Sequence, residues 1–128
     1  MATTDDMRQT ATRWVAEVIN AGRLDAAEEL CTPEAAERTR AWVGPFLSAF
    51  PDVRMDTVEL VAEGDTVVGR FECSATHAGE WRGRAATGRR FEAVDEVYFF
   101  HFDGDRIVDY WGIEDTLSRL DQLGLPPD

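Results

Sequence analysis

The hydrophobic period of this chain changes once, from helical to alternating, at Phe50-Pro51-Asp52. Before this point apolar residues recur every three or four positions, and after it they recur every second position, as on one face of a strand. Strands are predicted near 53–62, 66–77, 89–102 and 106–114, with hairpin turns at 63–65 and 103–105. Helices followed by antiparallel strands favour an α+β fold, with N-terminal helices packed on one face of a curved antiparallel sheet.

The first half of the chain predicts three helices. The first ends at Gly22 and carries one apolar stripe, formed by Met7, Ala11, Trp14, Val15, Val18 and Ile19. A short second helix is expected from about Leu24 to Cys31. The third begins at Thr32-Pro33, where a cap precedes proline at the first helical position, and Gly44-Pro45 is expected to kink or split it. Its stripe consists of Thr39, Trp42, Val43, Phe46, Leu47 and Phe50.

Length and charge narrow the possible classes of protein. The 128 residues suit one domain with one core, so residues 1–128 are expected to form a single domain. The net charge of -12 disfavours nucleic acids and anionic membrane surfaces as partners. "MATTDDMRQT" has no signal-peptide core and no apolar run is long enough to span a bilayer, which predicts a cytoplasmic protein. Cys31 and Cys73 fit no metal spacing and are expected to be reduced and buried.

Four phrases of the sequence resemble a known family. They are "AFPDVRMDTVELVAEGDTVVGRF", "THAGEWRGRAATGRRF", "FDGDRIVDYW" and "DQLGLPP", and they occur in a fixed order over almost the whole chain. Together they resemble the SnoaL-like polyketide cyclases of the nuclear transport factor 2-like superfamily. The resemblance implies an α+β barrel shaped like a cone, a deep apolar pocket and a homodimer. It also implies ring closure by intramolecular aldol condensation without metal or cofactor.

The sequence departs from the founding cyclases at two places. The segment between Cys31 and Trp42 is shorter, so the counterpart of a loop that forms a pocket wall is missing. Matching the phrases also places the family's catalytic aspartate at Gly112 and its active-site histidine at or next to Tyr98. The acid/base pair of the founding members is therefore absent from those positions.

The alternation of the last two predicted strands indicates which residues share a face. A three-residue loop at 103–105 would set Glu96 opposite Gly112, Tyr98 opposite Tyr110 and Phe100 opposite Val108. A two-residue turn at Asp103-Gly104 would instead set Glu96 opposite Trp111. With the longer loop, Glu96 could fill the space above Gly112, where burial would raise its pKa toward that of a general base. Arg70 is a possible partner if Glu96 has a structural role.

The candidate site residues follow from these placements. The catalytic candidates are Glu96 as acid or base, with Tyr98 and Tyr110 as hydrogen-bond donors to an enolate oxygen. The expected pocket residues are Trp14, Ile19, Trp42, Phe46, Phe100 and Gly112. Further candidates are His77, which could also hold its loop, and His101 and Asp109, expected as diagonal neighbours on the other face. Asp115 is too far along its strand to pair with His101 and could cap the C-terminal helix.

The sequence therefore predicts a cofactor-independent cyclase or isomerase of a hydrophobic polyketide-type intermediate. It would act by acid/base chemistry, by holding the substrate in a reactive shape, or by both. Two alternatives stay open, a non-catalytic binding or dimerisation module and an epoxide-opening enzyme built on a carboxylate–arginine–carboxylate cluster. An apolar outer face of the sheet predicts a homodimer and is formed by Val97, Phe99, Trp111 and Ile113.

Overall fold

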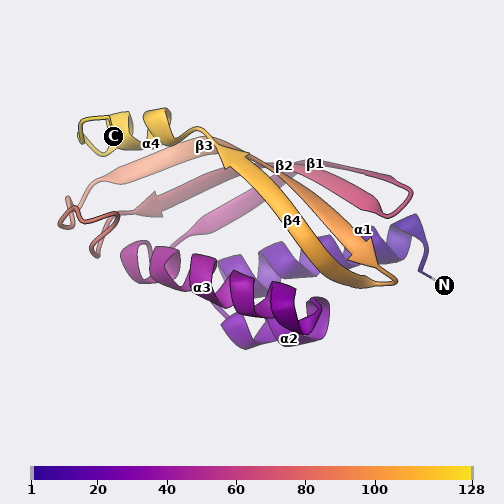
Figure 1. Ribbon diagram of the computed structural model, residues 1–128. Coiled ribbons are helices and arrows are strands. Elements are labelled where there is room, and N and C mark those ends of the chain that lie inside the picture. The colour runs from indigo at the N-terminus through magenta and orange to yellow at the C-terminus, as the bar shows by residue number, and fades with distance from the viewer. Residues whose placement is uncertain (1, 128) are drawn as a thin grey trace.

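The computed structural model describes residues 2–127, in which helices lie against one face of a four-stranded sheet (Figure 1). Helix α1 (Thr4–Arg13) continues as a π-helical stretch, Trp14–Asn20, and a short 3-10 turn, Leu24–Ala26, leads into α2 (Ala27–Leu30). The long helix α3 (Pro33–Ala49) follows, and α4 (Thr116–Gln122) comes after the last strand. None of the helices in residues 2–127 is long and apolar enough to cross a membrane.

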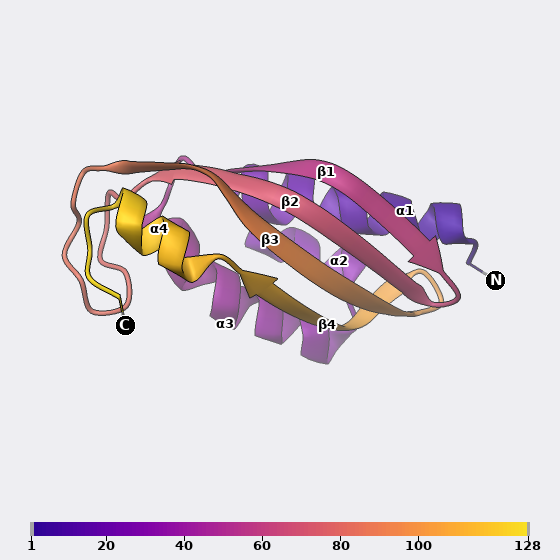
Figure 2. The same cartoon turned by 90° about the horizontal axis from the view of Figure 1, so that it is seen from above.

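The sheet is an antiparallel meander. Its strands are β1 (Arg54–Glu63), β2 (Thr66–Thr76), β3 (Arg90–Asp103) and β4 (Arg106–Glu114), paired in the order β1-β2-β3-β4. Seen from above, the strands lie in front of α1, α2 and α3, so these three helices cover the same face (Figure 2). The predicted α+β class and the predicted order of elements are confirmed.

The starts of α1 and α3 lie where the sequence signals place them, although Thr32 makes no side-chain hydrogen bond as the N-cap of α3. Thr3 and Asp6 form a capping box at α1, and Pro33 is the first residue of α3. Gly44-Pro45 does not split α3, which runs unbroken to Ala49, so the predicted split is wrong. The carbonyl that Pro45 leaves without a donor belongs to the exposed Ala41, where water can replace the lost bond.

The register of the β3–β4 hairpin differs from both predicted registers. Asp103 pairs with Arg106 around a two-residue turn, and Val108 is bulged out between the pairs Phe102–Ile107 and His101–Asp109. As a result Glu96 lies opposite Glu114, Tyr98 opposite Gly112, and Phe100 opposite Tyr110. The same shift places His101 directly opposite Asp109 rather than diagonal to it.

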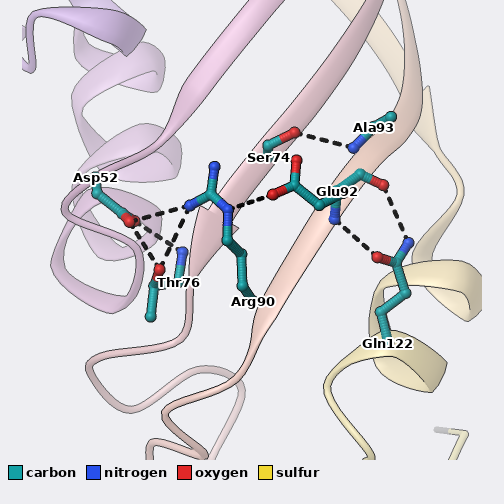
Figure 3. A network of polar contacts seen from close by, with 7 residues as sticks. All are labelled: Asp52, Ser74, Thr76, Arg90, Glu92, Ala93 and Gln122. Carbon is teal, nitrogen blue, oxygen red and sulfur yellow. Dashed lines mark hydrogen bonds and ion pairs between the residues drawn. The ribbon is translucent and has the colours of Figure 1, made fainter.

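A second bulge lies near the start of β3. Ser74 faces both Glu92 and Ala93, because Cys73 pairs with Val94 while Ala75 pairs with Phe91. Ala93 adopts φ 52°, which is unfavourable for a residue with a Cβ, and its N–H is held by Ser74 Oγ at 2.9 Å (Figure 3). The extra residue keeps Glu96 on the same inner face as Phe91; simple alternation from Phe91 would turn Asp95 inward instead.

Candidate active site

Two carboxylates lie inside the fold because one arginine binds both. Arg119 Nη2 donates to Glu96 Oε2 at 2.6 Å, and its Nη1 donates to Glu114 Oε1 at 2.7 Å. The side chains of Arg119 and Glu96 are 0% and 2% exposed, and that of Glu114 is 21% exposed. The Tyr98 hydroxyl donates to the other oxygen of Glu96. Strands β3 and β4 and helix α4 therefore meet in one buried polar cluster.

Arg119 reaches this cluster from a helix whose two ends are fixed. Asp115 caps α4 by accepting a hydrogen bond from Ser118 N at 3.0 Å, as predicted from the sequence. One turn beyond Arg119, the Gln122 amide accepts from Glu92 N at 2.7 Å and donates to Glu92 O at 3.2 Å (Figure 3). These contacts dock α4 on the start of β3 and aim Arg119 at Glu96.

The neighbouring strands are joined by a surface network at the same end of the sheet (Figure 3). Asp52 accepts hydrogen bonds from Thr76 N at 2.8 Å and Thr76 Oγ1 at 2.7 Å. Arg90 donates to Asp52 at 3.2 Å and also bonds Glu92. The network links the segment before β1 with β2 and β3, so the strand ends that support α4 are held together.

Aromatic rings surround the Arg119 guanidinium. Its central carbon lies 4.6 Å from the ring centroid of Phe91, 5.3 Å from that of Phe46 and 5.9 Å from that of Trp81. Such contacts stabilise a cation that has lost its water. The cation therefore stays charged between two carboxylates in a largely apolar environment.

A cavity of about 250 Å³ opens next to this cluster. Glu96, Tyr98 and Glu114 form its polar wall, and Arg82 adds a cation. The other lining residues are apolar: Ile19, Trp42, Val43, Pro45, Phe46, Met55 and Trp81. A carboxyl group set into an apolar wall is the arrangement that proton transfer to and from a carbon acid requires.

Burial sets the protonation of the polar wall. Burial raises the pKa of Glu96 above the ordinary glutamate value, the Arg119 cation opposes this, and the Glu114 carboxylate adds to it. Burial and the neighbouring Glu96 raise the pKa of Tyr98 well above its usual value, so its hydroxyl stays protonated and donates. The pKa of Arg119 is raised because the two carboxylates outweigh the effect of its burial.

Five of the predicted site residues line this cavity: Ile19, Trp42, Phe46, Glu96 and Tyr98. Trp14 and Phe100 do not, because both are fully buried in the core with their ring centroids 5.4 Å apart. Gly112 and Tyr110 line a separate open depression outside the cavity. The Tyr110 hydroxyl bonds Thr39 Oγ1 at 2.9 Å, so it does not join Glu96 in one site.

The space above Gly112 is filled by Tyr98 and not by Glu96. A Cβ at position 112 would lie 2.0 Å from Tyr98 Cδ1, so any side chain there would displace the ring. Arg70, considered as a partner for Glu96, instead bonds the exposed Asp95 at 3.0 Å. The predicted Glu96–Gly112 pairing is therefore wrong, and the arginine that pairs with Glu96 is Arg119 and not the alternative Arg70.

The remaining candidates have structural contacts. His77 is buried against Phe50, and its Nδ1 accepts a hydrogen bond from Thr87 N at 3.2 Å, which holds the loop after β2. Burial lowers the pKa of His77. Asp109 accepts from Arg38 Nη1 at 2.8 Å, and neither Asp109 nor His101 lines the cavity.

Sequence reasoning missed Glu114, Arg119, Trp81 and Arg82. Arg119 had a readable signal, because it occupies the buried stripe of α4 together with Leu120 and Leu123. An arginine in an otherwise apolar stripe of a short helix indicates a buried anion nearby. Glu114 had no such signal, since its position depends on the bulge at Val108.

Metal-ligating residues do not gather near the cavity. Within residues 2–127, no three or more histidine, cysteine, aspartate or glutamate side chains are placed to hold one metal ion. Cys31 and Cys73 are buried free thiols. Burial raises the pKa of Cys31 to about 11, so this thiol is a poor nucleophile near neutral pH.

Comparison with known proteins assigns the family. Residues 9–123 match the SnoaL-like polyketide cyclases, and the chain belongs to that family. Aklanonic acid methyl ester cyclase DnrD of Streptomyces peucetius is 28% identical over 110 residues, which are 86% of this chain and 74% of DnrD. The corresponding cyclase AcmA of Streptomyces galilaeus is 30% identical over 110 residues, with coverage of 86% of this chain and 74% of AcmA.

The fold is shared with a solved structure. TsrD from Streptomyces laurentii superimposes with a TM-score of 0.89 at 25% identity, over 98% of this chain and 100% of TsrD. The predicted family and fold class are therefore confirmed, and the family supports the predicted class of enzyme, a polyketide cyclase.

Proposed function

We propose that the protein closes or isomerises a ring in a hydrophobic polyketide-type intermediate without a cofactor, with Glu96 as general base. The observation that carries this proposal is a buried carboxyl group on the wall of an apolar cavity, bound by Tyr98 and Arg119. Burial raises its pKa above that of an exposed glutamate, toward the pH at which a base must both accept and return a proton.

The reaction needs only one proton to move and return. Glu96 takes a proton from a carbon between two carbonyl groups and leaves an enolate. The enolate carbon then attacks the carbon of a different carbonyl group farther along the same molecule. A C–C bond forms and the π bond of that carbonyl group breaks. The new alkoxide takes the proton back from Glu96. Product and substrate therefore have the same atoms, and the carboxylate is restored.

Each neighbour of Glu96 has a defined role in this scheme. Arg119 keeps a fraction of Glu96 ionised despite its burial. Tyr98 donates its single hydroxyl proton to Glu96 and holds that carboxylate in place, and Arg82 is a cation on the same wall that can face the oxygen that becomes negative. The apolar side chains Trp42 and Phe46 restrict the shapes that a flexible substrate can adopt.

The geometry argues against the binding-module alternative. That alternative predicts a sealed or very small cavity, or a Glu96 side chain that points to solvent. Glu96 does not point to solvent, because it lies on the wall of the cavity and is 2% exposed. A module that only binds an apolar ligand gains nothing from a buried carboxyl group, whose desolvation is costly.

Replacing Glu96 by glutamine tests the proposed base. Glu96→Gln keeps the shape of the side chain and is expected to lower kcat by about 10²–10⁴-fold, with little change in KM. In the wild type, kcat should rise with pH through a pKa above that of a free glutamate, because the ionised form is the base; this rise should vanish in the variant. Aklanonic acid methyl ester, the compound named for DnrD and AcmA, is the first substrate to assay.

The matched control is Asp95→Asn, one residue away on the exposed outer face, which should leave kcat unchanged. A Glu96→Gln enzyme with wild-type kcat would contradict the proposed base. If substitutions of Trp42 and Phe46 then reduced kcat strongly, catalysis would rest on substrate shape alone.

A second candidate function is favoured by one observation, the binding of two carboxylates by a single arginine. In epoxide opening, an ionised carboxylate removes a proton from water, whose oxygen attacks an epoxide carbon while the C–O bond breaks. A protonated carboxyl group donates its proton to the leaving oxygen, and the product is a diol. Glu96 and Glu114 could share these two roles.

Styrene oxide in oxygen-18 water tests this second function. Epoxide opening predicts a diol with one labelled oxygen and a large loss of rate in both Glu96→Gln and Glu114→Gln. The cyclase proposal predicts no enzymatic diol. It also predicts that Glu96→Gln lowers the rate of ring closure much more than Glu114→Gln does. Diol formation that depends on both glutamates would replace the cyclase proposal.

We also propose that the protein works as a cytoplasmic homodimer that pairs through the outer face of the sheet. Large apolar side chains are exposed there, including Val61 at 58%, Trp111 at 57% and Ile113 at 60%. Phe99 packs against Trp111 across β3 and β4, which makes the patch continuous. The two free cysteines are compatible with a reducing compartment.

Sedimentation equilibrium tests the dimer. The wild type should have twice the chain mass of 14.3 kDa, and Ile113→Glu should sediment as a monomer because the new charges would be desolvated at the interface. Leu117→Glu places the same charge at an exposed position of α4 and should leave the dimer intact. A wild-type mass of one chain would contradict this proposal.

A further inference from the structure

A tight turn carries two of the residues that line the cavity. Trp81 and Arg82 are on the cavity wall and belong to the loop between β2 and β3. Trp81 N donates to Arg84 O at 3.0 Å and Arg84 N donates to Trp81 O at 2.9 Å, which closes a two-residue turn. Its central residues, Arg82 and Gly83, have φ of 52° and 77°. Because a positive φ is unfavourable for an arginine, contacts from outside the turn have to hold it in this shape.

Helix α3 holds the segment that enters the turn. Ala78 N and Gly79 N both donate to Ala49 O, at 2.9 and 3.0 Å, and so satisfy the carbonyl of the last residue of α3. Gly79 approaches the helix so closely that a Cβ there would lie 2.5 Å from Ser48 O. This contact fixes the chain on the side of the turn that comes from β2.

The chain that follows α4 holds the turn itself. Gly124, at φ 72°, turns the chain back at the end of the helix, and the next backbone N–H donates to Leu120 O at 2.9 Å. We refer to residues 124–126 as the α4 tail. Pro126 O accepts a hydrogen bond from Arg84 Nη2 at 3.3 Å, and the tail runs beside the loop between β2 and β3 (Figure 2). The tail therefore contacts the turn through Arg84, the residue that closes it.

The same helix holds both the turn and the proposed base. Arg119 binds Glu96 from within α4, and its central carbon lies 5.9 Å from the Trp81 ring centroid. Arg89, at the other end of the loop, also lies against the tail, since a Cβ at Gly124 would be 2.3 Å from Arg89 Nη1. The position of the turn relative to Glu96 therefore depends on α4 and its tail.

We propose that Arg84 and the α4 tail are positioning elements of the active site, which hold the turn so that Arg82 faces the oxygen that becomes negative during the reaction. Neither Arg84 nor Pro126 lines the cavity, so both act through the turn. A charged donor stabilises a developing oxyanion best when it is held in place before the reaction begins. This inference rests on the proposed function, because it assumes that ring closure takes place beside Glu96.

Variants on the two sides of the contact test this role. Arg84→Met removes the donor to Pro126 O, and Gly124→Ala makes φ 72° unfavourable and redirects the tail. In both variants the backbone amides of Trp81 and Arg84 should exchange hydrogen about tenfold faster, as measured by NMR. We expect kcat to fall about tenfold with little change in KM. The pH dependence of kcat should keep its wild-type pKa, because the base and the arginine bound to it are untouched.

A double-mutant cycle tests whether Arg84 acts through Arg82. Arg82→Gln alone should lower kcat by about tenfold or more. Adding Arg84→Met to that variant should lower kcat by less than about twofold further, since the group that Arg84 positions is already gone. The matched control is Gly64→Ala, which replaces a glycine of φ 61° between β1 and β2 and should leave both kcat and the exchange of the two amides unchanged.

Three results would overturn the positioning role. They are unchanged amide exchange in Arg84→Met, a loss of kcat that adds fully to that of Arg82→Gln, and a shifted pKa in the pH dependence of kcat. Failure of the proposed function has a different signature, an unchanged kcat in Glu96→Gln, and the amide exchange does not depend on it.

Discussion

The buried guanidinium of Arg119 is the contact on which this structure depends. An unpaired carboxylate in a protein interior costs several kcal/mol, and here two carboxylates approach the same apolar cavity. Arg119 compensates for both through short hydrogen bonds from separate nitrogens. Because Glu96 is on β3, Glu114 on β4 and Arg119 on α4, the same contact closes that end of the fold. Helix α4, which closes this end of the fold, therefore also affects the pKa of Glu96 through Arg119.

Two β-bulges bring the acids to this contact. The bulge at Ala93 keeps Glu96 on the inner face, and the bulge at Val108 does the same for Glu114. Without the Val108 bulge, alternation from the buried Ile107 would turn Trp111 and Ile113 inward and Glu114 outward. The backbone strain at Ala93 is therefore located where the sheet changes which side chains it presents to the cavity.

Much of the fold, and part of the site, could be predicted from the sequence. The hydrophobic period predicted the positions of the helices and strands. The alternation of residues along the strands predicted that Glu96 and Tyr98 share one face of the sheet. The pairing of Glu96 could not be predicted, because a bulge adds one residue without a sequence signal as clear as a glycine turn. The sequence also could not predict whether Trp14 and Phe100 line the cavity or are buried in the core. Both residues lie on apolar faces, and an apolar face is expected in either case. The buried position of Arg119 was readable from the stripe of α4 but lies outside every motif that resembled the family.

The central claim, that Arg119 makes the buried carboxylates tolerable, is tested by urea unfolding of Arg119→Leu at about pH 5 and about pH 8. A carboxyl group whose pKa is raised in the folded state favours folding at low pH and loses that contribution as pH rises. Removing the cation raises this pKa further, so the variant should lose about 3–5 kcal/mol of stability at the higher pH and clearly less at the lower pH. Arg119→Lys, which keeps a charge, should lose less, and Arg70→Leu at the exposed pair with Asp95 should lose under about 1 kcal/mol at either pH. A loss in Arg119→Leu that is the same at both pH values, or no larger than that of Arg70→Leu, would contradict the account.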